Sequence, residues 1–181
     1  MKKFELTAES KINIFGKKLF RIKALISFGD VEEGETGGWI EKEENLEQSS
    51  GDAWVYGDAE VSGNAGVSGN AGVSGNARVY GNARVSGNAR VSGNAGVSGD
   101  AEVYGNADYA TIHGFGTQFR TTTFFQCEDK QIRVSCGCFL GTIPEFREQV
   151  KNTREGKIAE EYLMIADLME KHFVKEKESG E

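Results

Sequence analysis

The feature of the sequence that most constrains its fold is a period of six residues, which runs without interruption from Gly51 to Ala110. Its ten hexads are GDAWVY, GDAEVS, GNAGVS, GNAGVS, GNARVY, GNARVS, GNARVS, GNAGVS, GDAEVY and GNADYA. Alanine is third in every hexad and valine fifth in the first nine, so both side chains lie on one face of an extended segment. Repeats this short and regular indicate a β-solenoid of stacked coils. A disordered low-complexity tract, the alternative, requires no valine at every sixth position.

The hexad repeat also explains why glycine is abundant. The chain has 24 glycines and a single proline, and 13 of the glycines lie within the hexads. The Gly-Asn or Gly-Asp pair that opens each hexad suits a corner, because these residue types tolerate left-handed backbone conformations. The residue between alanine and valine is expected to face outward, beginning with Trp54.

The charged residues at these outward positions indicate how many hexads close one coil. If the coil contains three hexads, residues 18 apart stack, and every arginine meets a carboxylate. The three expected pairs are Arg78 with Glu60, Arg84 with Glu102, and Arg90 with Asp108. A coil of two hexads would instead place Arg78 on Arg90, a like-charge contact that destabilises. A coil of four hexads also makes some pairs, so charge disfavours two hexads without separating three from four.

Segments on both sides of the hexads can cover the ends of the solenoid, whose open strand edges need protection. Residues 1–50 form an expected N-terminal cap, with a hairpin from Ile12 to Ile22 around Gly16-Lys17-Lys18. The β-helix is assigned to residues 51–116, and residues 117–181 are expected to form a C-terminal hairpin and helices.

The C-terminal segment has clear local signals. Residues 121–127 and 132–136 predict two hairpin strands. Thr142 and Glu145 form a capping box at the start of a helix, with Pro144 in its first turn. A second helix is predicted from about Lys157, and its apolar stripe suits core or subunit packing. That stripe contains Ile158, Tyr162, Ile165, Met169 and Phe173.

An acidic segment runs from Asp30 to Gln48, with Lys42 as its only lysine. It is either a solvated surface loop or an interaction patch for a basic partner. The residues named for such a patch are Glu32, Glu33, Glu35, Trp39, Glu43 and Glu44.

Composition excludes several classes of function. The net charge of −7 argues against a nucleic-acid-binding groove, and no apolar run is long enough to span a membrane. The start, Met1-Lys2-Lys3-Phe4, is not followed by the apolar stretch of a signal peptide. The three cysteines are then expected to be reduced thiols in a cytoplasmic protein.

The copies of Val-Ser-Gly-Asn-Ala-Arg resemble the hexapeptide repeat of left-handed parallel β-helix proteins, the transferase-like superfamily. That resemblance implies triangular coils of three hexads and a mainly β fold. Phe28-Gly29-Asp30-Val31 and Gly37-Gly38-Trp39-Ile40, which lead into the repeats, look like the entry region of uncharacterised bacterial and prophage members. The tail, with TTTFF at 121–125 and VSCGCF at 134–139, is similar to that of phage and prophage versions.

The resemblance implies some chemistry that the residues support only weakly. The superfamily includes acyltransferases, in which a histidine acts as general base. Here the hexads contain no histidine, and only His113 and His172 exist. The superfamily's zinc-dependent carbonic anhydrases use three histidines, which this chain lacks. Cys127, Cys136 and Cys138 are weak candidates for a metal site, with packed thiols as the alternative. No cofactor is expected.

Two functions from different classes follow. The first is a non-catalytic phage- or prophage-type binding protein, a host-interaction or counter-defence factor that binds a host protein complex or a small signal molecule. The alternative is an acyl-coenzyme-A-dependent acyltransferase with an intersubunit site near His113. A dimer or trimer is expected to assemble through the C-terminal region.

Overall fold

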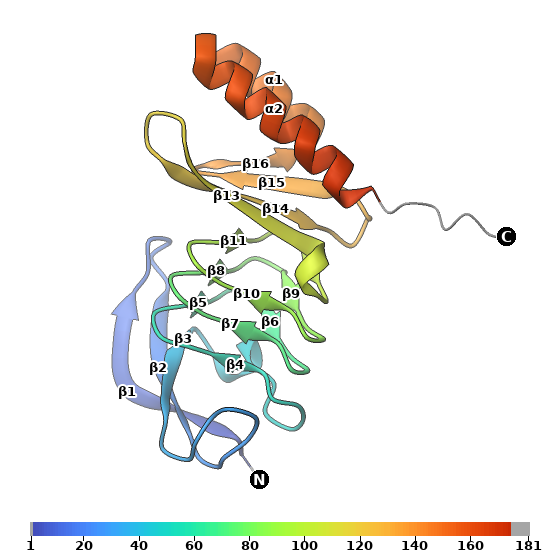
Figure 1. The fold of residues 1–181 in the computed structure, drawn as a ribbon. Coiled ribbons are helices and arrows are strands. Elements are labelled where there is room, and N and C mark those ends of the chain that lie inside the picture. The colour runs from blue at the N-terminus through green and yellow to red at the C-terminus, as the bar shows by residue number, and fades with distance from the viewer. Residues whose placement is uncertain (1, 175–181) are drawn as a thin grey trace, which may run out of the picture.

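The computed structural model describes residues 2–174 and contains a β-solenoid, an N-terminal hairpin along its side, and a C-terminal sheet with two helices at one end (Figure 1). Nine two-residue strands form the solenoid. They are β4 (Trp54–Val55), β5 (Glu60–Val61), β6 (Gly66–Val67), β7 (Gly72–Val73), β8 (Arg78–Val79), β9 (Arg84–Val85), β10 (Arg90–Val91), β11 (Gly96–Val97) and β12 (Glu102–Val103).

The strands stack in parallel with a register of 18 residues. Glu60 pairs with Arg78, which in turn pairs with Gly96 on the same face. The other two faces contain β4, β7 and β10, and β6, β9 and β12. The prediction of three hexads per coil is therefore confirmed. The alanines and valines of these nine hexads are buried and form one continuous core.

The tenth hexad leaves the solenoid, unlike its nine predecessors. Its residues Asn106–Asp108 form the short 3₁₀ helix η2, and Tyr109 begins strand β13 (Tyr109–Phe115). Tyr109 is the position at which the hexads lose their valine. The boundary expected at residue 116 thus falls after the first strand of the C-terminal sheet.

A further partial coil precedes the hexads. Strand β3 (Thr36–Ile40) pairs in parallel with β5, and Ile40 lies beside Val61. Beyond the short helix η1 (Glu43–Asn45), Leu46 forms a bridge with Val67. Much of the acidic segment is therefore part of the stack. Ile40 and Leu46 are six residues apart, as in the hexads. The next core residue, Val55, lies nine residues after Leu46, so the period of six is broken and the sequence pattern does not reveal this coil.

The N-terminal hairpin widens one solenoid face into a larger sheet. Strands β1 (Phe4–Ile12) and β2 (Lys18–Ala24) are antiparallel, and β2 pairs with β3. A hairpin was correctly predicted here, but its first strand precedes the expected range of Ile12 to Ile22, and residues 13–17 form the turn. The resulting sheet has the order β1-β2-β3-β5-β8-β11. The hairpin therefore runs alongside the solenoid, and its turn points toward the C-terminal sheet (Figure 1).

Trp54 is an exception to the expectation that the residue between alanine and valine faces solvent. Its side chain is fully buried, under residues that precede the solenoid. The rings of Phe4 and Phe28 meet it edge-on, with centroids at 6.2 and 5.4 Å. The sequence pattern could not show this, because the cover comes from residues 26 to 50 positions away in the chain.

The C-terminal sheet lies across the last coil of the solenoid. It contains β13, β14 (Arg120–Gln126), β15 (Ile132–Cys136) and β16 (Phe139–Thr142) in sequential antiparallel order. The predicted hairpin forms its two central strands. Phe125 packs into the solenoid core, whereas its neighbour Phe124 faces the helices on the opposite side of the sheet. The Gly96 amide donates to Thr123 Oγ1 at 3.0 Å. Thr123 thus replaces the backbone acceptor that a further coil would have provided.

Two helices, α1 (Ile143–Thr153) and α2 (Gly156–Phe173), cover the far face of this sheet (Figure 1). The predicted capping box is confirmed: Thr142 Oγ1 accepts from the Glu145 amide, and Glu145 Oε2 accepts from the Thr142 amide at 2.7 Å. Tyr162, Ile165 and Met169 of the predicted stripe are buried. No helix among residues 2–174 is both long and apolar enough to cross a membrane.

We expect Gly75→Ala to lower the free energy of unfolding by roughly 2 kcal/mol, because Gly75 has a φ of +66° and a Cβ there would lie 3.0 Å from the Gly93 carbonyl oxygen of the next coil. Chemical denaturation followed by circular dichroism measures the change.

Two matched variants separate the effect of the positive φ from that of the contact with the next coil. Gly57 also has a positive φ, of +57°, but has open space around it, whereas Gly66 has open space and no positive φ. Gly66→Ala should change stability by less than about 0.5 kcal/mol, and Gly57→Ala should fall between the two. If Gly75→Ala costs no more than Gly57→Ala, close contact between coils does not constrain the corner.

Candidate binding cleft

The charged residues on the solenoid surface form ladders between coils. Arg78 Nε lies 3.7 Å from Glu60 Oε2, and Lys11 of the hairpin approaches the other Glu60 oxygen at 2.8 Å. On a second face, Arg84 Nη1 lies 3.9 Å from Glu102 Oε1. The arginine side chains of these pairs are exposed, whereas the Glu60 and Glu102 side chains are only 13 and 11% exposed. With solvent-exposed arginines the pairs are worth about 0.2–1 kcal/mol each, so they favour the register without supplying most of the stability.

The third expected pair, between Arg90 and Asp108, does not form. Asp108 Oδ2 instead accepts from the backbone amides of Tyr104 and Gly105, both at 2.9 Å. The physical reason is that η2 ends the solenoid here, so no coil continues above Arg90. The Arg90 amide donates to Asn106 Oδ1 at 2.8 Å in place of a coil-to-coil hydrogen bond.

Asparagine ladders at the corners were not among the sequence predictions. Asn64 donates to Asn82, which donates to Asp100, and Asn70 donates to Asn88. Asn76 donates to Asn94 Oδ1 at 3.3 Å. The signal was present in the sequence, because asparagine recurs at positions that are 18 residues apart.

The acidic segment does not present its named residues as one patch. Trp39 was expected at an interaction surface, but its side chain is buried between Lys11 and Arg21, whose cationic groups lie 4.6 and 4.3 Å from its ring centroid. Its place in β3, within the six-stranded sheet, explains the difference. Glu43 forms an ion pair with Lys2 at 2.7 Å, and Glu35 accepts from the Glu32 amide.

The other named carboxylates are distributed over this part of the surface. Glu32, Glu33 and Glu44 are exposed, on either side of the buried strand β3. Glu41 accepts from the Gly63 amide at 2.7 Å, which lowers the pKa of its carboxyl group. The Glu41 carboxylate therefore stabilises the first coil.

The three cysteines are not brought together. Cys127 is buried, Cys136 accepts a hydrogen bond from the Thr122 hydroxyl, and Cys138 is exposed. Among residues 2–174, no group of three or more His, Cys, Asp or Glu side chains could hold a metal ion. Burial raises the pKa of the Cys127 thiol to about 11.

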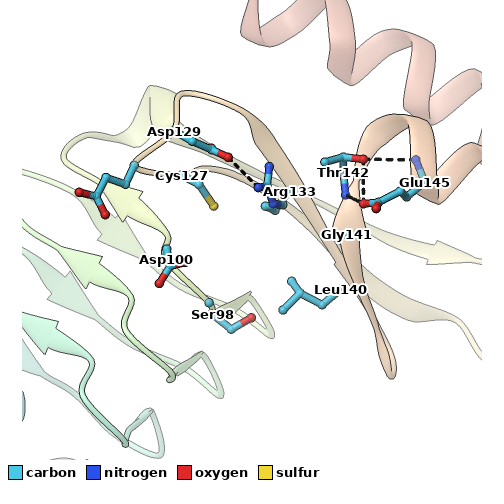
Figure 2. Close-up of a pocket in the computed structure, with 11 residues that line it drawn as sticks. Ser98, Asp100, Cys127, Asp129, Arg133, Leu140, Gly141, Thr142 and Glu145 are labelled. Carbon is cyan, nitrogen blue, oxygen red and sulfur yellow. Dashed lines mark hydrogen bonds and ion pairs between the residues drawn. The ribbon is translucent and has the colours of Figure 1, made fainter.

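A cavity of about 590 Å³ separates the last coil from the turn between β14 and β15 (Figure 2). Most of its ionic groups already have partners in the fold, and the Glu128 carboxylate adds a negative charge to its lining. Arg133 pairs with Asp129 at 2.7 Å, Asp100 accepts from Asn82, and Glu145 belongs to the capping box. These contacts make the cavity a structural junction between the solenoid and the sheet.

A second hollow, which we call the arginine cleft, has a different character. Its volume is about 400 Å³, and three parts of the chain line it. Ile14 and Phe15 come from the hairpin turn, Arg78, Tyr80 and Asn94 from the solenoid, and His113, Phe119 and Arg120 from the C-terminal sheet.

The arginine cleft is cationic in a protein of net charge −7. Arg78 and Arg120 line it, together with His113, and no Asp or Glu does. Arg78 also lies 3.7 Å from Glu60, so Arg120 is the arginine of the cleft without an ion pair among the described residues. Asn94 ends its ladder, so its amide group is available to donate. A hollow lined by charges of one sign concentrates ligands of the opposite sign. The cleft is therefore suited to an anionic ligand.

Aromatic and aliphatic side chains form its rim. The rings of Phe15 and Tyr80 lie 4.6 Å apart, which joins the hairpin turn to the solenoid. Ile14, Phe15 and Phe119 are 69, 48 and 64% exposed. Exposed apolar groups of this size around a polar centre are typical of an interaction site. Sequence reasoning missed this cluster, although Ile14 and Phe15 at a hairpin turn were a signal.

His113, the residue proposed as a general base, lies in this cleft. Its Nδ1 is 3.1 Å from Thr121 Oγ1, which is the only hydrogen bond of its ring among residues 2–174. No carboxylate orients the imidazole, unlike the arrangement in which a third group positions a catalytic base.

Comparison with known families supports the solenoid fold. A family described as YdcK beta solenoid repeat matches residues 71–85 and 83–99, which lie in the middle of the hexads. No curated protein matches the chain.

The cysteines provide a test of the site geometry. At pH 8, iodoacetamide should alkylate Cys138 rapidly and Cys127 very slowly, because the thiolate is the reactive form and the Cys127 pKa is about 11. The Cys127 rate should rise with pH until about pH 11. Mass spectrometry of tryptic peptides measures both rates, and equal rates at pH 8 would show that Cys127 is not buried as described.

Proposed function

We propose that this protein acts by binding, and that the arginine cleft is its binding site for an anionic ligand. The observation that carries this proposal is the cleft's lining of Arg78, His113 and Arg120 without a carboxylate, inside a rim of exposed apolar side chains. The solenoid holds the cleft in shape, because the core of stacked valines and alanines is continuous beneath it.

We further propose that the protein is of phage or prophage type and works in the host cytoplasm as a host-interaction or counter-defence factor. The sequence resemblance of the entry region and the tail supports this step. Its ligand would be an acidic surface of a host protein complex or a small anionic signal molecule. Both share the chemistry that the cleft recognises, which is negative charge next to an apolar or planar group.

Arg120→Glu tests the cleft directly. Reversing the charge of an exposed side chain should weaken ligand binding by about tenfold or more and leave the fold intact. The control is Arg90→Glu, which alters an exposed arginine on a different solenoid face.

The measurement compares wild-type protein and both variants. Quantitative pulldown from a host lysate detects a protein partner, and native mass spectrometry detects a small molecule that remains bound after purification. Partners or adducts that Arg120→Glu loses and Arg90→Glu keeps support the cleft. Binding that both variants retain in full would contradict it.

The alternative function is acyl transfer, which the position of His113 in the same cleft favours. Calorimetric titration with acetyl-coenzyme A distinguishes the two functions. Binding, together with transfer of the acetyl group to an added hydroxyl or amine acceptor and release of coenzyme A thiol, would establish the alternative if His113→Ala loses the transfer. Absence of any heat of binding with the folded protein would exclude it.

A further inference from the structure

The outer surface of α2 carries two large apolar side chains that the fold does not use. Met164 and Leu168 are 70 and 57% exposed, and they lie one helical turn apart on the same face. The opposite face of α2 buries Tyr162, Ile165 and Met169 against the sheet and α1. No side chain among residues 2–174 buries Met164 and Leu168.

Charges are placed symmetrically around this apolar pair. Glu161 precedes Met164 by three residues, and Lys171 follows Leu168 by three. If a second α2 lies antiparallel across the first, Met164 meets the partner's Leu168, and Glu161 meets the partner's Lys171. The same operation places Glu160 beside the partner's His172. Between Glu160 and His172 the helix is therefore complementary to itself in both apolar and charged positions.

A parallel arrangement would lack this match. It would place Glu161 beside the partner's Glu161 and Lys171 beside the partner's Lys171, and such like-charge contacts are unfavourable. Asp167 and Glu170 of α2 do not disturb the antiparallel contact, because both already pair with Arg147 of α1 at 2.7 Å. Within α2, Glu161 has only an exposed partner, Lys157 at 3.5 Å, which a stronger contact can replace.

We propose that two copies of this protein associate through α2, antiparallel about a two-fold axis between Met164 and Leu168. The interface is isologous, so each contact occurs twice. A single helix pair is smaller than a standard interface, so the dimer forms at high protein concentration and dissociates on dilution. This inference does not depend on the proposed function, because the arginine cleft lies on the solenoid side of the sheet and α2 on the other side.

Sedimentation velocity over a concentration series tests the dimer, with full-length protein. Wild-type protein should shift from monomer to dimer as its concentration rises. Glu161→Lys alone and Lys171→Glu alone should each weaken the dimer by about tenfold or more. The double variant Glu161→Lys/Lys171→Glu exchanges the charges and should restore it.

Two further variants make the test specific. Leu168→Glu should abolish the dimer, whereas Glu148→Lys, an exposed charge reversal on α1, should leave it unchanged. Circular dichroism confirms that each variant is folded. A wild-type protein that stays monomeric at all concentrations, a dimer that survives Leu168→Glu, or single variants whose loss the double variant does not restore would each overturn the proposal.

Discussion

Everything in this structure depends on the stacking of one coil on the next at intervals of 18 residues. Backbone amides of one coil donate to carbonyls of the next, as Trp54 does to Ala71 and Arg78 to Ala95, at 3.0 and 2.9 Å. The corners come so close that the backbones are in direct contact, which leaves room for glycine alone at positions such as Gly75. The side chains inside the coil must then be small or β-branched, and the hexads supply alanine and valine.

Stacking also explains the two ends of the molecule. A solenoid ends in unpaired strand edges and exposed apolar groups, which must be covered. At the start, Phe4 and Phe28 cover Trp54, and the first partial coil contributes Ile40 and Leu46. At the far end, the C-terminal sheet inserts Phe125 and takes up the Gly96 amide. The arginine cleft arises where this sheet extends beyond the coil and faces the hairpin turn.

The sequence alone was sufficient for the parts of the fold that repeat or that are local. The stacked coils follow from the regular spacing of valine, the charges disfavour a coil of two hexads, and the resemblance to left-handed β-helix proteins implies three. The start of α1 follows from Thr142 and Glu145, which are close in the chain. Contacts between distant segments did not follow, because nothing in the hexad pattern reports on them. In the sequence, Trp54 resembles any other outward residue and Asp108 any other ladder position. Their surroundings are set by Phe4 and Phe28 before the solenoid and by the helix η2 at its end. Of the cleft, the sequence indicates His113 as a candidate site residue and Arg78 only as a ladder residue. Phe15, Arg78 and Arg120 are separated from His113 by up to 98 residues in the chain.

Site-specific photocrosslinking tests most directly whether the arginine cleft is where this protein meets its ligand. A photoreactive phenylalanine analogue at position 119 lies on the cleft rim, and the same analogue at position 90 lies on another solenoid face. After irradiation in cells that express the protein, we expect an adduct of defined mass at position 119 and none at position 90. No adduct at position 119, or the same adducts at both positions, would contradict the assignment of the cleft as the binding site.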